Sequence, residues 1–410
     1  MKNRNLILII GTISMIIFGL MYNWTVFSKP VSESLNTSVA STTLVFSFCQ
    51  ISFCIGGVLS GFLFKKLPYQ PSMIIGACLV GTGLFLTSMA TNINSIYLTY
   101  SLIFNFSSGF CYKNLLTTVI RWFKDKAGFA TGVLLMGCGL SAFVSNMPMT
   151  FLIEMIGWRS AMKVLALIAF AVSLLSALYI TPCKEDKNAT TKSVVNEFDE
   201  QVTTKKMIKD PRFYFFFMWT VLILAGATTL SGNSVILAVG FGMTASFGAM
   251  LSMTVSLTNS MSRIAYGIIY DRKGRKLAMS ICTAMFLLSI ICLNIFIFTK
   301  ISYLLVLAMV FIGLCFGGIP SIASTYVLKT FGNENYPSNF SIQGLYSLFA
   351  SQLGTTLFGV IYSNTQSYEK ALSILLLYAI ITLLLYFIIN KVIANKNKQR
   401  DMKMIEKCAS

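Results

Sequence analysis

Histidine is absent from this chain of 410 residues, and acidic residues are scarce, with 14 Asp and Glu in all. The missing histidine removes the most common general base and metal ligand of proteins. The ten cysteines form no CxxC pair or other metal-like spacing, and we expect them to be small buried hydrophobic residues. These absences argue against an enzyme, and we expect no metal and no cofactor.

Charge of either sign is also rare, since only 11% of the residues are charged while 55% are hydrophobic. Crossing a bilayer as a helix takes about 20 consecutive apolar residues. Such runs are continuous here, whereas the strands of a membrane barrel alternate in polarity. The sequence therefore predicts an all-α polytopic membrane protein in a lipid bilayer, with twelve transmembrane helices at residues 6–28, 42–64, 72–90, 96–120, 127–153, 159–182, 213–238, 244–270, 277–298, 301–328, 339–363 and 368–392.

The net charge of +18 is distributed unevenly between the predicted loops. If the N-terminus is cytoplasmic, the loops and tails on that side carry 25 of the 32 Lys and Arg residues. This is the positive-inside asymmetry of membrane proteins. It predicts a multi-pass protein of the cell membrane with both termini in the cytoplasm, and it explains the basic charge without a nucleic-acid partner.

A charged turn recurs at half the chain length. Residues Gly267–Lys276 contain one acid and four bases after an apolar run, and Gly61–Gln70, 206 residues earlier, has the same leading glycine but only bases. Two related halves in a membrane protein are typical of a transporter. We therefore predict a six-helix bundle at 1–182, a cytoplasmic connector at 183–212, a second six-helix bundle at 213–395 and a basic tail at 396–410.

Four motifs resemble the major facilitator superfamily, and within it the oxalate/formate antiporter and monocarboxylate transporter-like group. The superfamily loop signature Gly-x-x-x-Asp-Arg-x-Gly-Arg is complete in the second half. The other three are the Tyr-x-Trp-x-x-Phe-x-x-Pro pattern from Tyr22, the fourth loop Arg121–Gly132, and an Arg on the eighth helix in Asn259–Gly267. The resemblance implies two pseudo-symmetric six-helix bundles, transport by alternating access and a monomer.

The chain departs from that group at two positions. The second cation that oxalate exchangers carry on the eleventh helix is replaced by Phe349, which puts a dicarboxylate substrate in question. Proton-coupled monocarboxylate carriers have an Asp one turn before the helix-eight Arg, where this chain has Asn259.

Lys113 and Arg263 are the two charged residues that lie deep within the predicted spans, and no Asp or Glu does so. Lys113 lies eight residues before Arg121, and Arg263 lies eight before Asp271. At the helical rise, each is roughly 12 Å from the cytoplasmic boundary. A cation buried in a membrane costs about 2.5–3.5 kcal/mol on insertion scales. We expect a small organic anion to offset this charge, bound by both cations in a central cavity. The alternative is that one or both side chains snorkel to the cytoplasmic surface or bind backbone carbonyls.

Further polar and aromatic residues are candidates for completing the substrate site. The family resemblance supports Tyr22 and Trp24, although Trp24 is also suited to interfacial anchoring. Asn259 shares a helix face with Arg263. The weaker candidates, for which hydrogen bonding between helices is an equal alternative, are Asn233, Tyr326, Gln343 and Tyr346.

The signature loop has a gating role if the resemblance holds. Asp271 and the bases around it would then form charge contacts between helices that latch the outward-open state. The gating residues implied are Gly267, Asp271, Arg272 and Arg275.

Four other functions compete with anion exchange or uniport. A proton symporter needs a membrane-embedded group that titrates near neutral pH. The spans contain no His, Asp or Glu at depth, which leaves Lys113 as the only candidate. A drug exporter of the same superfamily would carry an acid in its cavity and often a Gly-Pro pair in helix five, and both are missing. For a membrane enzyme, the chain lacks a nucleophile–base pair or metal ligands at membrane depth. A sensor that binds without transporting remains open.

Overall fold

Apolar helices make up nearly the whole of the computed structural model, which describes residues 3–409 except 38, 65, 124, 183–200 and 366. No strand occurs in those ranges. Lipid offers backbone groups no hydrogen-bond partner, so an apolar segment satisfies them internally by forming a helix. The described helices include nine segments long and apolar enough to cross a membrane. The chain is a multi-pass membrane protein.

The helices group into two units of contact, each described separately. The first contains Met1–Val194 and Tyr336–Gly344, and the second Val195–Asn335 and Leu345–Ser410. The second predicted bundle thus contributes one short segment, Tyr336–Gly344, to the first unit. The predicted connector lies mostly outside the described residues, and the predicted domain boundaries stay a prediction.

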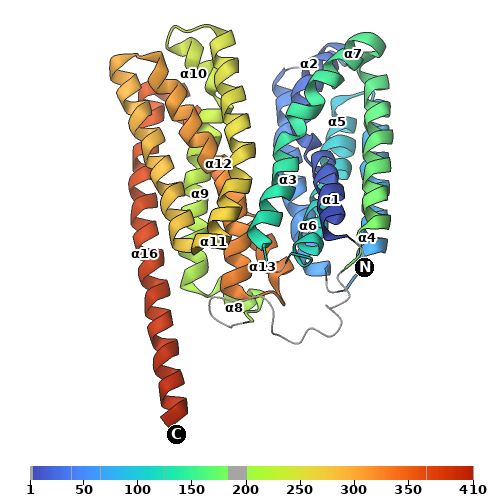
Figure 1. Cartoon of the computed structure of the whole chain (residues 1–410). Coiled ribbons are helices and arrows are strands. Elements are labelled where there is room, and N and C mark those ends of the chain that lie inside the picture. Colours follow the sequence, from blue (N-terminus) through green and yellow to red (C-terminus); the bar gives the residue numbers. More distant parts are fainter. Residues whose placement is uncertain are drawn as a thin grey trace. The chain divides into compact units, whose positions relative to one another are not determined.

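In the first unit, α7 packs against α1 and α4, and α3 packs against α6 (Figure 1). Its elements are α1 (Arg4–Phe18), η1 (Leu20–Asn23), α2 (Trp24–Ser34), α3 (Val39–Leu63), α4 (Tyr69–Ser88), α5 (Ile93–Ile96), η2 (Tyr97–Phe104), α6 (Asn105–Ile120), α7 (Ala127–Tyr179) and the separate α13 (Tyr336–Gln343).

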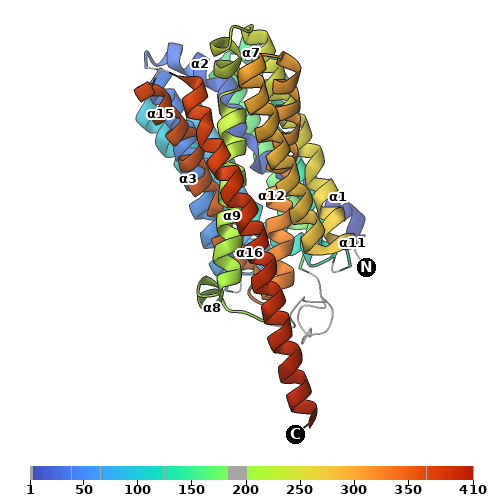
Figure 2. The same ribbon diagram turned by 90° about the vertical axis from the view of Figure 1, so that its left-hand side faces the viewer.

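In the second unit, α9 packs against α12, α14 and α16, while α11 packs along α12. Its elements are α8 (Thr204–Ile208), α9 (Pro211–Gly232), α10 (Ser234–Gly240), α11 (Ala245–Thr299), α12 (Ser302–Phe331), α14 (Tyr346–Ser351), η4 (Gln352–Thr356), α15 (Leu357–Thr365) and α16 (Tyr368–Ala409). The last helix extends well past its neighbours (Figure 2).

Two of the longest helices each contain a reversal that makes them two membrane crossings. In α7 the backbone at Gly157 has φ 77°, and in α11 the backbone at Gly274 has φ 80°. Positive φ is accessible to glycine because it has no Cβ. A further apolar stretch, 93–120, is divided among α5, η2 and α6. With these divisions, the helices of the described residues correspond to the twelve predicted spans, and the predicted fold class is confirmed.

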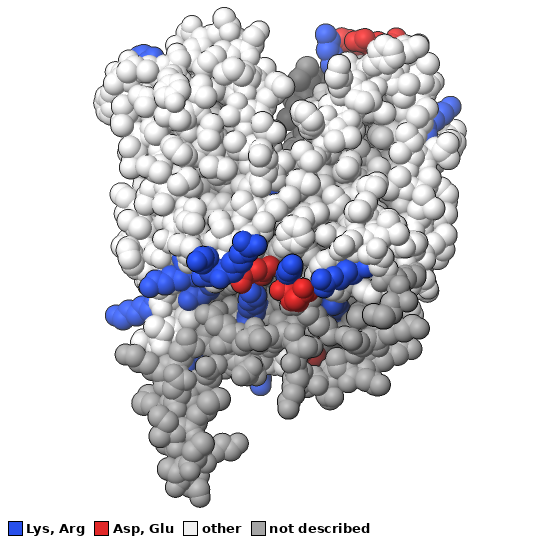
Figure 3. Space-filling view, in the orientation of Figure 1, with Lys and Arg blue, Asp and Glu red and all other residues white. Residues whose placement is uncertain are grey.

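The outer surfaces of the helices are apolar. Exposed side chains include Phe143, Met147, Leu167, Phe298 and Phe387. Figure 3 shows broad uncharged surfaces, with Lys, Arg, Asp and Glu gathered toward their edges. Apolar exposure on this scale fits contact with lipid hydrocarbon and not with water.

Candidate functional site

Arg263 lies in the interior of α11, eight residues before Asp271. Its side chain is buried, with 7% of the residue exposed, and its Nε donates a hydrogen bond to Asn259 Oδ1 at 3.1 Å. Ser321 of α12 donates to the Arg263 carbonyl oxygen at 2.9 Å, which fixes this part of α11 against α12. The structure therefore brings the predicted pair Arg263 and Asn259 together and holds the guanidinium away from the lipid surface.

Lys113 lies in α6 and is 8% exposed. Its ammonium lies 3.3 Å from the carbonyl oxygen of Phe340 and 3.3 Å from the centre of the Phe340 ring. The ring of Tyr112 is more distant, at 5.8 Å. No carboxylate forms an ion pair with Lys113 within the part of the chain that the structure describes. The amine is thus held inside the first unit and does not snorkel to a surface.

The two aromatic candidates of the first predicted span, Tyr22 and Trp24, have different surroundings. Trp24, 2% exposed, donates its indole N–H to the Thr42 carbonyl oxygen at 2.7 Å and packs on Tyr100 at 4.9 Å between ring centres. Tyr22 is half-buried in η1, with its ring 6.2 Å from that of Phe46. Trp24 therefore ties α2 to α3, and a role for either residue toward a substrate stays a prediction.

Gln343 and Tyr346 lie on opposite sides of a break in the predicted eleventh span. Gln343 is fully buried at the end of α13 in the first unit, and Tyr346, 7% exposed, begins α14 in the second. Lys113 and Arg263 likewise belong to different units. Their predicted convergence on a single anion therefore stays a prediction.

Two other weaker candidates of the second unit form hydrogen bonds to backbone carbonyls. Asn233 donates to Thr229 at 2.8 Å. Tyr326 donates to the Arg212 carbonyl at 3.1 Å, and its ring stacks on Phe216 at 3.7 Å. Each side chain thus donates to a backbone carbonyl, and a role for either toward a substrate stays a prediction.

The signature loop forms contacts between helices inside the second unit. Lys329 of α12 donates to Asp271 Oδ1 at 3.3 Å. Arg275 donates to Asn390 Oδ1 of α16 at 2.9 Å, across 115 positions of sequence. Gly267 is buried and Arg272 is exposed. The expected charge contact of Asp271 is thus present, while its effect on gating stays a prediction. Lys65 occupies the position of Asp271 in the first-half turn Gly61–Gln70, and it lies outside the described residues.

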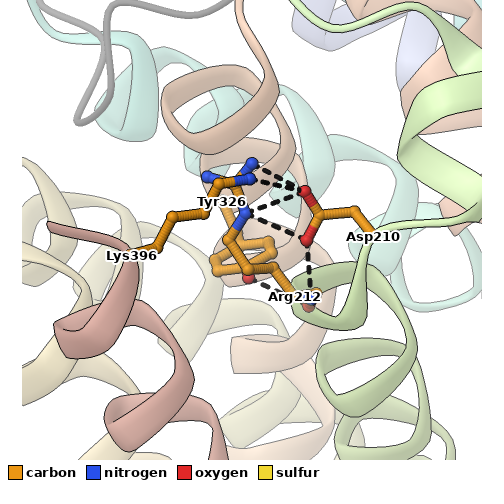
Figure 4. Close-up of polar contacts among 4 residues, drawn as sticks. All are labelled: Asp210, Arg212, Tyr326 and Lys396. Atoms are coloured by element: carbon orange, nitrogen blue, oxygen red, sulfur yellow. Dashed lines mark hydrogen bonds and ion pairs between the residues drawn. The ribbon is translucent and has the colours of Figure 1, made fainter. Parts of the chain in front are cut away.

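A buried charge cluster at the start of α9 is not among the predicted sites. The carboxylate of Asp210 accepts hydrogen bonds from the Arg212 side chain at 2.7–3.0 Å and from Lys396 at 3.0 Å (Figure 4). The Arg212 side chain is fully buried, and its guanidinium lies 5.4 Å from the Phe331 ring centre. The sequence signal was the Asp-Pro pair before an apolar run, which is typical of a helix N-terminus. Lys396, 186 positions away, has no local signal.

The protonation of Asp210 reflects these partners. Burial alone raises the pKa of its carboxyl, but hydrogen bonds and charge from Arg212, with a further hydrogen bond from Lys396, outweigh burial and hold the pKa below its ordinary value. The carboxylate is therefore ionised at neutral pH. Among the described residues, no group of three or more His, Cys, Asp and Glu side chains is placed to hold a metal ion.

Comparison with known families identifies the family of this chain. The family model described as "Major Facilitator Superfamily" matches residues 8–359 and again 224–402. The chain belongs to the major facilitator superfamily. The predicted resemblance is confirmed at this level, and the family consists of transporters and not of enzymes.

Among curated relatives, the "Oxalate:formate antiporter" of Oxalobacter formigenes is 24% identical over 392 residues, covering 93% of this chain and 91% of the relative. "Monocarboxylate transporter 12" of Rattus norvegicus is 30% identical over 149 residues, covering 35% of this chain and 30% of that protein. These are the two groups whose motifs the sequence resembles.

Solved structures show the same fold at low identity. The Escherichia coli fucose:proton symporter FucP matches with a TM-score of 0.66 and 13% identity, covering 95% of this chain and 99% of that one. The proton:xylose symporter XylE matches with a TM-score of 0.69 and 12% identity, covering 94% and 95%. The similarity establishes the fold alone.

Proposed function

We propose that this superfamily member is a secondary transporter that moves a small organic anion, a mono- or dicarboxylate, across the cell membrane by exchange or uniport. The observation that carries the proposal is Arg263, a buried guanidinium inside a membrane-spanning helix, oriented by Asn259. A guanidinium presents two parallel N–H donors that match the two oxygens of a carboxylate. The motifs shared with carboxylate transporters support the same substrate class.

Lys113 is the second proposed binding cation, supplied by the first unit. Its ammonium contacts a carbonyl and an aromatic ring instead of a carboxylate, so an anionic substrate offers it a stronger partner. In the proposed orientation both termini are cytoplasmic, because that side then carries most of the basic residues. Exchange or uniport is favoured over proton symport because no His, Asp or Glu lies deep in a predicted span.

Purified protein in liposomes tests the proposal. Uptake of labelled formate, lactate and oxalate is measured with and without unlabelled anion inside the vesicles. We expect uptake of at least one carboxylate, accelerated by internal anion if the protein exchanges. Uptake that requires an inward proton gradient would contradict exchange and uniport.

Arg263→Gln tests the role of the guanidinium. Charge-assisted hydrogen bonds contribute about 1.5–3 kcal/mol, so the apparent affinity should fall roughly 10- to 150-fold. Lys370→Gln is the matched control, because it removes an exposed base of the same unit, away from the signature loop. Wild-type uptake by Arg263→Gln at low substrate concentration would refute the assignment.

A further inference from the structure

The short helix α13 is held on the first unit by hydrogen bonds to the backbone of α3. Ser341 donates to the Gly57 carbonyl oxygen at 2.9 Å, and Ser338 donates to the Gly61 carbonyl oxygen at 2.9 Å. A Cβ added to Gly61 would overlap the Ser341 side chain. The two helices therefore approach closely, and the contact depends on small residues on both of them.

The chain breaks its helix immediately after this contact. Helix α13 ends at Gln343, and the following residues, from Leu345 on, belong to the second unit, where α14 packs on α9. A Cβ built on Gly344, at the break, would lie 3.1 Å from the Lys113 ammonium. The proposed substrate-binding amine thus lies beside the point where the chain leaves the first unit.

Phe340 supplies the contacts that hold this amine. Both its carbonyl oxygen and its ring centre lie 3.3 Å from Lys113 Nζ, and the Phe340 side chain is buried. A neutral carbonyl and a ring quadrupole attract an ammonium less strongly than a carboxylate does, and ionised partners form roughly twice the hydrogen-bond energy of neutral ones. An anion that reaches Lys113 therefore competes with α13 for the same charge.

We propose that Phe340 is a positioning residue that sets substrate affinity by holding the Lys113 ammonium, so that anion binding and the docking of α13 on the first unit oppose each other. The proposal rests on the proposed function, since it needs an anionic substrate at Lys113. Linkage makes the effect reciprocal: the anion loosens α13, and a firmly docked α13 weakens anion binding. Substrate binding would in this way act on a segment from which the chain passes into the second unit, just after Gly344.

Phe340→Leu is the direct test. It removes the ring from the ammonium while keeping an apolar side chain and the backbone carbonyl. We expect the half-saturating concentration for uptake of labelled formate, lactate or oxalate to fall by about 5- to 30-fold, the equilibrium equivalent of a desolvated cation–π contact. Phe104→Leu is the matched control, a buried phenylalanine of the same unit that packs on Tyr100, and it should leave that concentration unchanged.

Ser341→Ala tests the competition by a second route. It removes the hydrogen bond to Gly57 without altering the ring beside Lys113, and it should also lower the half-saturating concentration, by roughly 2- to 10-fold for one hydrogen bond. Ser341→Ala still tests the competition between the anion and α13 if Phe340→Leu does not fold. A raised or unchanged half-saturating concentration in the folded variants would overturn the proposal, and a raised value for Phe340→Leu alone would make Phe340 a direct substrate contact.

The outcomes separate this proposal from the function on which it rests. If wild-type protein transports no carboxylate, the proposed function fails and this inference fails with it. If wild-type protein transports a carboxylate, Arg263→Gln lowers the apparent affinity as expected and the α13 variants behave as wild type, only the competition at Lys113 is refuted.

Discussion

Replacing Asp210 with Asn should destabilise the second unit more than any exchange of an exposed acid. Asp210 has two roles, because it accepts the backbone N–H of Arg212 at 2.9 Å as the N-cap of α9 and also neutralises two cations. Asparagine is an equally good N-cap. The substitution therefore isolates the loss of charge.

The magnitude follows from the burial of the partners. The Arg212 side chain is 0% exposed and that of Asp210 is 10% exposed. Breaking a buried ion pair by removing one partner costs about 3–5 kcal/mol, because the other charge stays buried. The retained amide oxygen still accepts a hydrogen bond, so we expect the lower end of that range. At about 2–4 °C per kcal/mol for a unit of 150–250 residues, the apparent Tm should fall by roughly 6–12 °C.

Thermal unfolding of the purified protein in detergent, followed by fluorescence, measures this shift. Asp125→Asn is the matched control, since the Arg4–Asp125 pair has the same 3.0 Å contact distance as Lys396–Asp210 but side chains that are 49% and 50% exposed. Exposed pairs contribute about 0–1 kcal/mol, so its shift should stay below roughly 4 °C. Equal shifts for the two variants would refute the reasoning from burial.

The pH dependence gives an independent check with a definite sign. The folded pKa of Asp210 lies below its ordinary value of 3.8, so its contribution to stability is complete above that value and is lost as the pH falls through the folded pKa. The difference in Tm between wild type and Asp210→Asn should therefore be constant from pH 7 to 5 and shrink below about pH 4. A difference that grows on acidification would contradict the assignment.

Two further predictions concern Trp24 in α2 and Asp271 in the signature loop. Trp24→Phe should lower the free energy of unfolding by about 0.5–1.5 kcal/mol, because it removes the indole hydrogen bond to the Thr42 carbonyl. Thermal melts check this, and a raised half-saturating concentration in uptake would keep Trp24 as a substrate contact. Asp271→Asn should slow exchange about 5-fold with little change in affinity, because it loses roughly 1 kcal/mol from its pair with Lys329. Counterflow rates in liposomes check this, and a large loss of affinity at normal turnover would contradict a latch.

The membrane topology followed from the sequence because hydropathy is a local property. A run of about 20 apolar residues is itself a membrane-spanning helix, whatever its neighbours. The hydropathy pattern likewise placed Lys113 and Arg263 inside spans and Asp271 at a helix end. The reversals at Gly157 and Gly274 also fell between predicted spans, where positive φ favours glycine.

The partners of these side chains were decided by tertiary packing. Lys113 meets Phe340 across 227 positions, and Asp210 meets Lys396 across 186. A helical pattern predicts which face a residue occupies, but the opposing helix and its register depend on contacts summed over the whole unit. Hydropathy alone placed residues 339–363 in a single span, whereas packing assigned α13 to one unit and α14 to the other. The sequence thus determined which charges enter the membrane, and the tertiary structure decided what each of them contacts.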